Sequence, residues 1–154
     1  MSTRHHLPAA AIADLAEVSF VHPLDANAVR HTRTLSESAG LRNLGVHLVR
    51  IEPGRTTTEY HFHQAEEEFL YVLAGHGVAE IDGRETAVGP GDFLGFPAGG
   101  PAHAMRNEGP GDLVYLMAGQ RLPGDVVDYP RKGKRLLKAL GHRQMVDLPV
   151  EDAR

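Results

Sequence analysis

The stretch "TTTEYHFHQAEEEFLYVLAG", residues 56 to 75, contains the pattern on which the fold and the chemistry of this chain depend. It places His61 and His63 one residue apart, ahead of three consecutive glutamates and an apolar run that ends at Gly75. In an extended segment the two histidines point to the same side, because side chains in a strand alternate with a period of two. In a helix they point about 200° apart and cannot contact one object. The secondary structure of this stretch therefore determines its chemistry.

The composition favours an all-β domain. A chain of 154 residues is close to the commonest length of a single domain and can bury a core without cross-links. Its 17 glycines and 10 prolines fall between short apolar runs, as expected for many tight turns. There is no cysteine, so disulfides and thiolate metal sites are excluded, and any metal must be held by nitrogen and oxygen atoms.

The charge pattern gives no sign of a nucleic-acid or membrane partner. The formal net charge is -4, and the only local basic excess is "RKGKR" at 131 to 135, which no aromatic residues accompany. No run approaches the ~18 apolar residues of a membrane span. The N-terminal stretch is interrupted by Pro8, Asp14 and Glu17 before it could form the apolar part of a signal peptide. We therefore expect a soluble, cytoplasmic protein.

Short apolar runs separated by glycine-rich corners predict a series of strands. Asp82-Gly83, between "VAEI" and "ETAV", is a strong signal for a type I′ hairpin turn. Strands spaced 8 to 12 residues apart are typical of a sandwich or small barrel. The remaining predicted strands cover residues 44 to 51, 68 to 75, 93 to 97, 102 to 107 and 113 to 119.

One segment near the C-terminus predicts a helix. In "KRLLKALG", residues 134 to 141, three leucines fall on one side and Gly141 is a C-cap candidate. We expect an N-terminal arm over 1–34, a barrel over 35–120, and a C-terminal arm over 121–154 that contains this short helix.

The opening stretch, once assigned to strands, suggests a metal site. Glu59, His61 and His63 share one face, and Glu68 shares a face of the next strand with Leu70 and Val72. If both faces point into a barrel, two imidazoles and a carboxylate converge and leave coordination positions open for water or substrate. The alternative is a surface or hydrogen-bonded histidine pair. His103 lies on a later strand that could face the same interior.

Two groups of residues resemble the two motifs of the cupin superfamily. The first is formed by Gly54, His61, His63, Glu68 and Gly75, and the second by Gly91, Pro97, Gly99, His103 and Asn107. The resemblance covers residues 54 to 107 and departs from the family pattern by one extra residue before His61 and one before His103. Both insertions fall in turns, where length varies at little cost.

The resemblance implies a fold and a ligand set. It implies a cupin-type double-stranded β-helix, or jelly-roll, barrel with short N- and C-terminal arms. It also implies that His61, His63, Glu68 and His103 bind one divalent metal inside the barrel. The flanking segments "AGLRNLGVHLVRIEPG" and "GDVVDYPRKGKRLL" resemble those of small bacterial single-domain cupins of uncertain activity, some of them labelled as sugar-phosphate isomerases.

Three neighbouring glutamates compete for the carboxylate position. The family spacing admits Glu67 as well as Glu68. Strand parity groups Glu68 with Leu70 and Val72, and its distance from Gly75 along the chain fits the motif, so we favour Glu68. We expect Glu66 and Glu67 to lie in the turn, in contact with solvent.

These features predict a metal-dependent cupin that acts on a small polar metabolite by isomerase, lyase or dioxygenase chemistry. The metal is a divalent transition ion, with Zn, Fe, Ni, Mn and Cu all compatible with nitrogen and oxygen ligands. Glu59 and Tyr60 are the first candidates for proton transfer. The alternative is a non-catalytic module that binds or senses a small molecule through the same metal. Four apolar side chains on the opposite parity must be covered, which predicts a homodimer: Phe62, Phe69, Tyr71 and Leu73.

Overall fold

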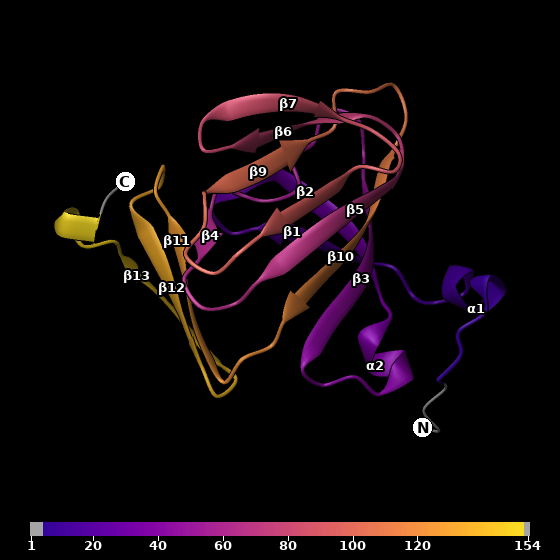
Figure 1. The fold of residues 1–154 in the computed structure, drawn as a ribbon, viewed down its shortest axis with the longest axis horizontal. Coiled ribbons are helices and arrows are strands. Elements are labelled where there is room, and N and C mark those ends of the chain that lie inside the picture. The colour runs from indigo at the N-terminus through magenta and orange to yellow at the C-terminus, as the bar shows by residue number, and fades with distance from the viewer. Residues whose placement is uncertain (1–4, 153–154) are drawn as a thin grey trace.

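The strands of this chain follow its alternating apolar residues. The computed structural model describes residues 5–152, which form three antiparallel sheets with little helix (Figure 1). The largest sheet has the order β1-β2-β3-β10-β5-β8. Its strands are β1 (Val18–His22), β2 (Asp25–Thr34), β3 (Leu44–Ile51), β10 (Leu113–Gln120), β5 (Glu68–Ala74) and β8 (Phe93–Phe96).

Two smaller sheets complete the barrel. One has the order β7-β6-β9, with β7 (Arg84–Val88), β6 (Gly77–Ile81) and β9 (His103–Arg106). The other has the order β13-β12-β11-β4, with β13 (His142–Asp147), β12 (Lys134–Ala139), β11 (Gly124–Tyr129) and β4 (Phe62–His63). Short helical turns lie outside the sheets: α1 (Ala9–Ala13), α2 (Ser36–Ala39) and a 3₁₀ turn, η1 (Val150–Asp152). The predicted all-β, jelly-roll architecture is confirmed.

The core lies between the large sheet and the sheet β7-β6-β9. It is built from inward-facing residues of alternate positions, as the strand period requires. Removal of this apolar surface from water is the main stabilising contribution to the fold. The buried cluster contains Val49, Ile51, Leu70, Val72, Ala79, Val88, Leu94, Phe96, Met105, Leu113 and Tyr115.

The predicted hairpin turn is confirmed. Asp82 and Gly83 have φ angles of 50° and 71° and join β6 to β7. Positive φ at both central positions defines the type I′ turn, whose twist matches that of the flanking strands.

The helix predicted over 134–141 is wrong. Residues Lys134–Ala139 form β12, which pairs with β11 on one side and β13 on the other. Leu140 and Gly141, with φ angles of 49° and 84°, form the turn into β13. The helix preference indicated by three leucines at helical spacing is smaller than the stabilisation from hydrogen bonds to strands on both sides of this segment. The pattern within a single segment does not reveal such pairing.

The segments expected as arms contribute strands to the sheets. β1 and β2 extend the large sheet beyond β3, and β11 pairs with β4, which carries His63. Among residues 5–152, no helix is long and apolar enough to cross a membrane.

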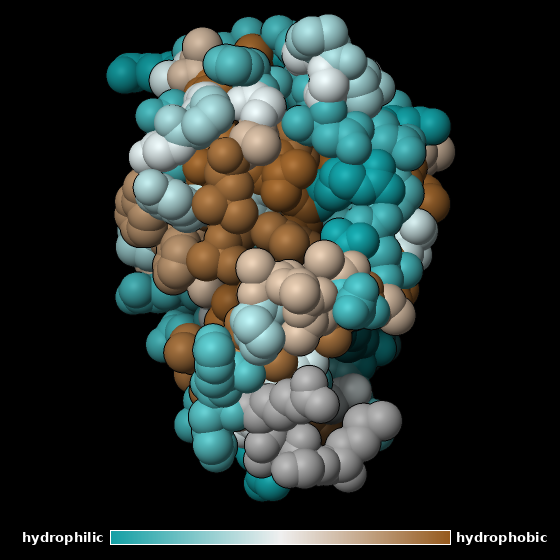
Figure 2. Space-filling view, turned by 90° about the vertical axis from the view of Figure 1, so that its right-hand side faces the viewer, coloured by the Kyte–Doolittle hydropathy of each residue, from teal (hydrophilic) through white to brown (hydrophobic). Residues whose placement is uncertain are grey.

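The outer face of the large sheet carries apolar residues. Phe62 is buried within the chain, but Tyr71 and Leu73 are 40% and 46% exposed, and Phe93 on the adjacent strand is 63% exposed. Figure 2, which views the right-hand side of Figure 1, shows hydrophobic residues gathered in a band with hydrophilic surface around it.

Candidate metal centre

The site is assembled by backbone pairing between segments far apart in sequence. The N–H groups of His61 and His103 each donate to the other residue's carbonyl oxygen, at 3.1 and 2.8 Å. His63 lies in β4 and pairs with Val127 of β11, while Glu68 begins β5. Three strands and a bridge therefore fix the positions of all four side chains.

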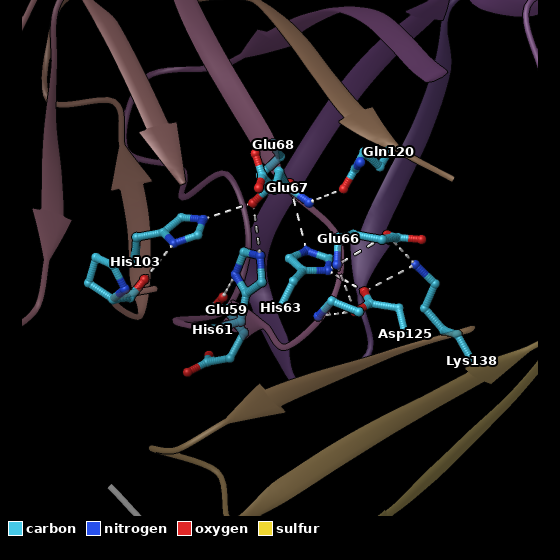
Figure 3. A network of polar contacts seen from close by, with 12 residues as sticks. Glu59, His61, His63, Glu66, Glu67, Glu68, His103, Gln120, Asp125 and Lys138 are labelled. Atoms are coloured by element: carbon cyan, nitrogen blue, oxygen red, sulfur yellow. Dashed lines mark hydrogen bonds and ion pairs between the residues drawn. The ribbon is translucent and has the colours of Figure 1, made fainter. Parts of the chain in front are cut away.

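The three imidazole rings surround one carboxylate (Figure 3). His103 Nε2 lies 2.8 Å from Glu68 Oε1, and His61 Nε2 lies 3.5 Å from the same oxygen. His63 Nε2 lies 3.7 Å from Oε2 of Glu68. All four ligands implied by the resemblance are therefore brought together.

The other nitrogen of each ring has an acceptor. Nδ1 of His61 lies 2.9 Å from the carbonyl oxygen of Glu59, and Nδ1 of His103 lies 3.1 Å from that of Pro101. Nδ1 of His63 lies 2.6 Å from Asp125 Oδ2. Because carbonyl and carboxylate oxygens only accept, each Nδ1 carries a hydrogen. Nε2, which here contacts the carboxylate of Glu68, is therefore the ring atom that could give a lone pair to a metal after losing its own hydrogen. Such outer contacts are typical of metal-binding histidines.

The donor atoms fit a first-row divalent ion. Two ligands about 2.0 to 2.2 Å from one ion are separated by roughly 3.0 to 3.5 Å at bond angles between a right angle and the tetrahedral value. The donor atoms of His61, His63 and Glu68 lie within 4.8 Å of one another. His103 is not part of this tight triad and joins it through Glu68 and through its ring, 4.6 Å from that of His61.

The electrostatics favour an ionised Glu68. Burial alone would raise the pKa of this carboxyl, but the hydrogen bonds from His103 and His61 outweigh burial and hold the pKa well below its usual value. Burial lowers the pKa of His61, despite the opposing charge of Glu68. The site thus combines a carboxylate with a neutral imidazole at neutral pH, which are the forms that bind metal.

Asp125 is a residue of the candidate site that the sequence patterns did not predict. Besides His63, it accepts hydrogen bonds from the backbone N–H groups of Ala65 and Glu66. Burial would raise the pKa of Asp125, but its contact with His63 and these N–H groups lower it. Asp125 lies 62 residues from His63 in the chain, and no motif spacing connects them.

Glu66 is buried, which corrects the expectation that it contacts solvent. Its carboxylate accepts from the ammonium of Lys138 at 2.8 Å and from the N–H of Leu122 at 3.1 Å. His63, Glu66 and Asp125 form a second group with metal-ligand types. The ammonium of Lys138, 3.7 Å from Asp125 Oδ2, offsets part of the negative charge of the two carboxylates, and Asp125 is also the acceptor beside Nδ1 of His63.

A cavity of about 580 Å³ opens onto the site. This volume suits a small organic ligand. His61, His63, Glu68 and His103 all line it. The other walls are largely apolar and aromatic and include Phe20, Leu70, Phe96, Met105, Tyr115, Met117 and Tyr129.

Glu59 and Tyr60 lie outside this cavity. Both line a smaller cavity of about 130 Å³. The hydroxyl of Tyr60 accepts from the N–H of Gly83, and its ring lies 3.9 Å from the guanidinium of Arg131. The backbone bends at 57, 58 and 60, so the strand parity that grouped Glu59 with His61 does not hold there. This placement gives no support to proton transfer by either residue.

Comparisons with known proteins agree with the all-β fold. A family model described as the cupin domain matches residues 47–119. The structure of a candidate sugar phosphate isomerase from Acidithiobacillus ferrooxidans is 43% identical, with a TM-score of 0.91, over 97% of this chain and 95% of that chain. A sugar phosphate isomerase from a cupin superfamily, from Silicibacter pomeroyi, is 26% identical, with a TM-score of 0.82, over 92% and 97%.

A curated relative matches over a shorter region. The oxalate-binding protein of Thermotoga maritima is 32% identical over 68 residues, which are 44% of this chain. The match spans 54%, about half, of that protein's length.

Proposed function

The chain belongs to the cupin superfamily, and from that premise we propose that it is a metal-dependent enzyme acting on a small polar metabolite. The observation that carries the proposal is the convergence of His61, His63 and Glu68, joined by His103, on the wall of a cavity. A divalent transition ion held there, whether Zn, Fe, Ni, Mn or Cu, would supply Lewis-acid polarisation of a substrate oxygen, or activation of dioxygen if it is iron.

The chain itself supplies orientation and a dry environment. The contacts to Nδ1 fix the three rings and leave Nε2 directed at one point. The apolar walls exclude water, which strengthens electrostatic interactions with a bound substrate. These properties suit isomerase, lyase or dioxygenase chemistry at a polarised carbonyl or hydroxyl.

The named relatives support an enzyme. A protein 43% identical over nearly the full length of both chains is described as a candidate sugar phosphate isomerase. Isomerisation of a sugar phosphate requires polarisation of a carbonyl oxygen, which a Lewis acid provides. The fold alone would not separate these chemistries, because one architecture hosts many functions.

A second candidate function is binding without turnover. The observation that favours it is the match to a protein named for oxalate binding, at 32% identity over 68 residues. In that case the same cavity and metal hold a small ligand that leaves unchanged.

Elemental analysis of protein purified without an affinity tag tests the metal centre. We expect one ion per chain in the wild type and in His142→Ala, which alters an exposed histidine of β13. We expect a large loss of metal in His61→Ala and Glu68→Ala. A metal content near zero in the wild type, or equal content in all four proteins, would contradict the proposal.

A metabolite screen with the metal-loaded protein separates the two functions. Turnover that disappears in Glu68→Ala, and that free metal alone does not produce, supports the enzyme. Saturable binding with the ligand recovered unchanged supports the binding module instead.

A further inference from the structure

Arg30 is a cation on the wall of the same cavity. It lies in β2, in register with Phe20 of β1, and its guanidinium lies 4.8 Å from the centre of the Phe20 ring. Arg30 is only partly exposed, and Arg30 and Phe20 both line the cavity that contains the metal site. The guanidinium therefore faces the same space as Glu68 and its histidines.

Arg30 has no anionic partner among residues 5–152. Most other arginines of the barrel are paired: Arg50 with Glu17, Arg106 with Glu85, Arg131 with Glu80 and Arg135 with Asp128. Two of the three glutamates that line the cavity are engaged elsewhere, since Glu68 contacts the imidazoles and Glu66 contacts Lys138. A partly buried guanidinium without a carboxylate leaves its donors available for an anion.

Tyr115 supplies a hydroxyl group on the wall of the same cavity. Its residue is 1% exposed and lines the cavity from β10. Burial raises the pKa of Tyr115, so the hydroxyl keeps its proton and can donate.

Both groups line one cavity, from strands that lie on either side of β3 in the large sheet: Arg30 from β2 and Tyr115 from β10. An oxyanion in that cavity can therefore accept from both. Three further cations line the cavity, Arg121, Lys138 and Arg143, and Arg143 has no carboxylate partner among the described residues.

We propose that Arg30 and Tyr115 bind an oxyanion of the substrate, a carboxylate or a phosphate, while the metal centre holds its reacting oxygen. The substrate is therefore a small anionic metabolite with an anionic group at one end and a carbonyl or hydroxyl at the other. This inference rests on the proposed function for the role of the metal, whereas the anion site itself does not require the metal.

The test measures anion binding to the metal-free protein. Inorganic phosphate and acetate are titrated separately, and the rise in unfolding temperature with anion concentration gives each Kd. We expect saturable binding, weakened about tenfold or more in Arg30→Gln because a charge-assisted contact is lost. We expect a smaller loss in Tyr115→Phe, partial retention in Arg30→Lys, and no change in Arg84→Gln, an exposed arginine of β7. The tighter probe identifies the anionic group.

The outcomes separate this inference from the proposed function. Unchanged Kd values in both Arg30→Gln and Tyr115→Phe, or no saturable binding of either anion to the wild type, would overturn the anion site. The same variants are analysed for metal, which they should retain. Anion binding that depends on Arg30 in a protein with no metal affinity would support the anion site and overturn the metal-dependent function.

Discussion

His63 is held from both sides of its imidazole ring. Asp125 accepts from Nδ1, and Nε2 faces Glu68. Asp125 is in turn fixed by two backbone N–H groups and lies near the ammonium of Lys138. The orientation of one metal-ligand candidate thus depends on residues of β11 and β12.

Replacement of Asp125 by asparagine tests this dependence. An amide can turn its NH₂ group toward Nδ1 of His63, which then accepts and leaves the hydrogen on Nε2, where it blocks metal binding. We expect Asp125→Asn to lower metal affinity by about 10- to 100-fold, measured by competition with a coloured chelator. Asp147→Asn, at an exposed ion pair with Lys134, is the matched control and should bind normally. Equal affinity in both variants would show that other contacts orient His63.

The pKa of His63 predicts how metal affinity depends on pH. Burial would lower this pKa, but the hydrogen bond to Asp125 and the charge of Glu68 outweigh burial and raise it. A metal binds only the neutral imidazole, so protons compete with it for His63. Because the pKa is raised, this competition begins at a pH above the ordinary histidine pKa of about 6.5 and grows as the pH falls. We expect affinity to rise with pH through that region.

The contribution of His63 to the folding stability of the metal-free protein should fall as the pH rises, the opposite of the trend in metal affinity. A raised folded-state pKa stabilises the fold below the unfolded value of about 6.5, and this contribution is lost as pH rises through the folded pKa. The stability difference between wild type and Asp125→Asn should therefore shrink on going from about pH 6 to 9. Thermal unfolding of chelator-treated protein measures it, and a difference that grows with pH would contradict the assignment.

Among the structural elements, the turn after β5 is unusually close to β10. Gly75 has a φ of 81°, and a Cβ added there would lie 2.3 Å from the carbonyl oxygen of Asp112. Gly83 has a φ of 71°, but nothing lies within 4 Å of an added Cβ. The two glycines share a conformation and differ in available space.

Alanine substitution at these positions separates the two effects. Gly83→Ala should cost about 1 to 2 kcal/mol of unfolding free energy, from the left-handed backbone alone. Gly75→Ala should cost more than about 3 kcal/mol, because backbone of β10 must also move. Denaturant unfolding measures both, and similar losses would show that the contact with Asp112 relaxes at little cost.

β12 illustrates the limit of local patterns. Its sequence has helical spacing of leucines, yet each of its residues pairs with a residue of β11 and of β13. Here hydrogen bonding between segments decided the structure, whereas at Asp82-Gly83 the local turn chemistry and the pairing agreed.

Over the whole molecule, the outer face of the large sheet remains open. A row of apolar side chains crosses four adjacent strands in register: Leu48, Leu116, Tyr71 and Phe93. A contiguous apolar band on a sheet face is typical of an interaction surface (Figure 2). A second copy of this chain would cover it symmetrically.

We expect a homodimer that uses this face. Sedimentation of the wild type should give a dimer at micromolar concentration, and Leu73→Lys combined with Phe93→Lys should give a monomer, because a charge would be buried in an apolar contact. Val150→Lys, at a residue 90% exposed in η1, should remain dimeric. A monomeric wild type would remove this prediction.

The sequence by itself predicted the strands of the central barrel, and its resemblance to the cupin motifs predicted the cluster of His61, His63, Glu68 and His103. The alternation of apolar and polar residues, the turn residues and the motif spacing are local properties, which can be read from consecutive residues of the sequence. Only the tertiary structure placed Asp125, Arg30 and Tyr115 at the site, buried Glu66, and turned Glu59 away from it. Those placements arise from contacts between segments dozens of residues apart and from bends in the backbone. Neither the two-residue period of a strand nor the spacing of a motif predicts which side chains are in contact there.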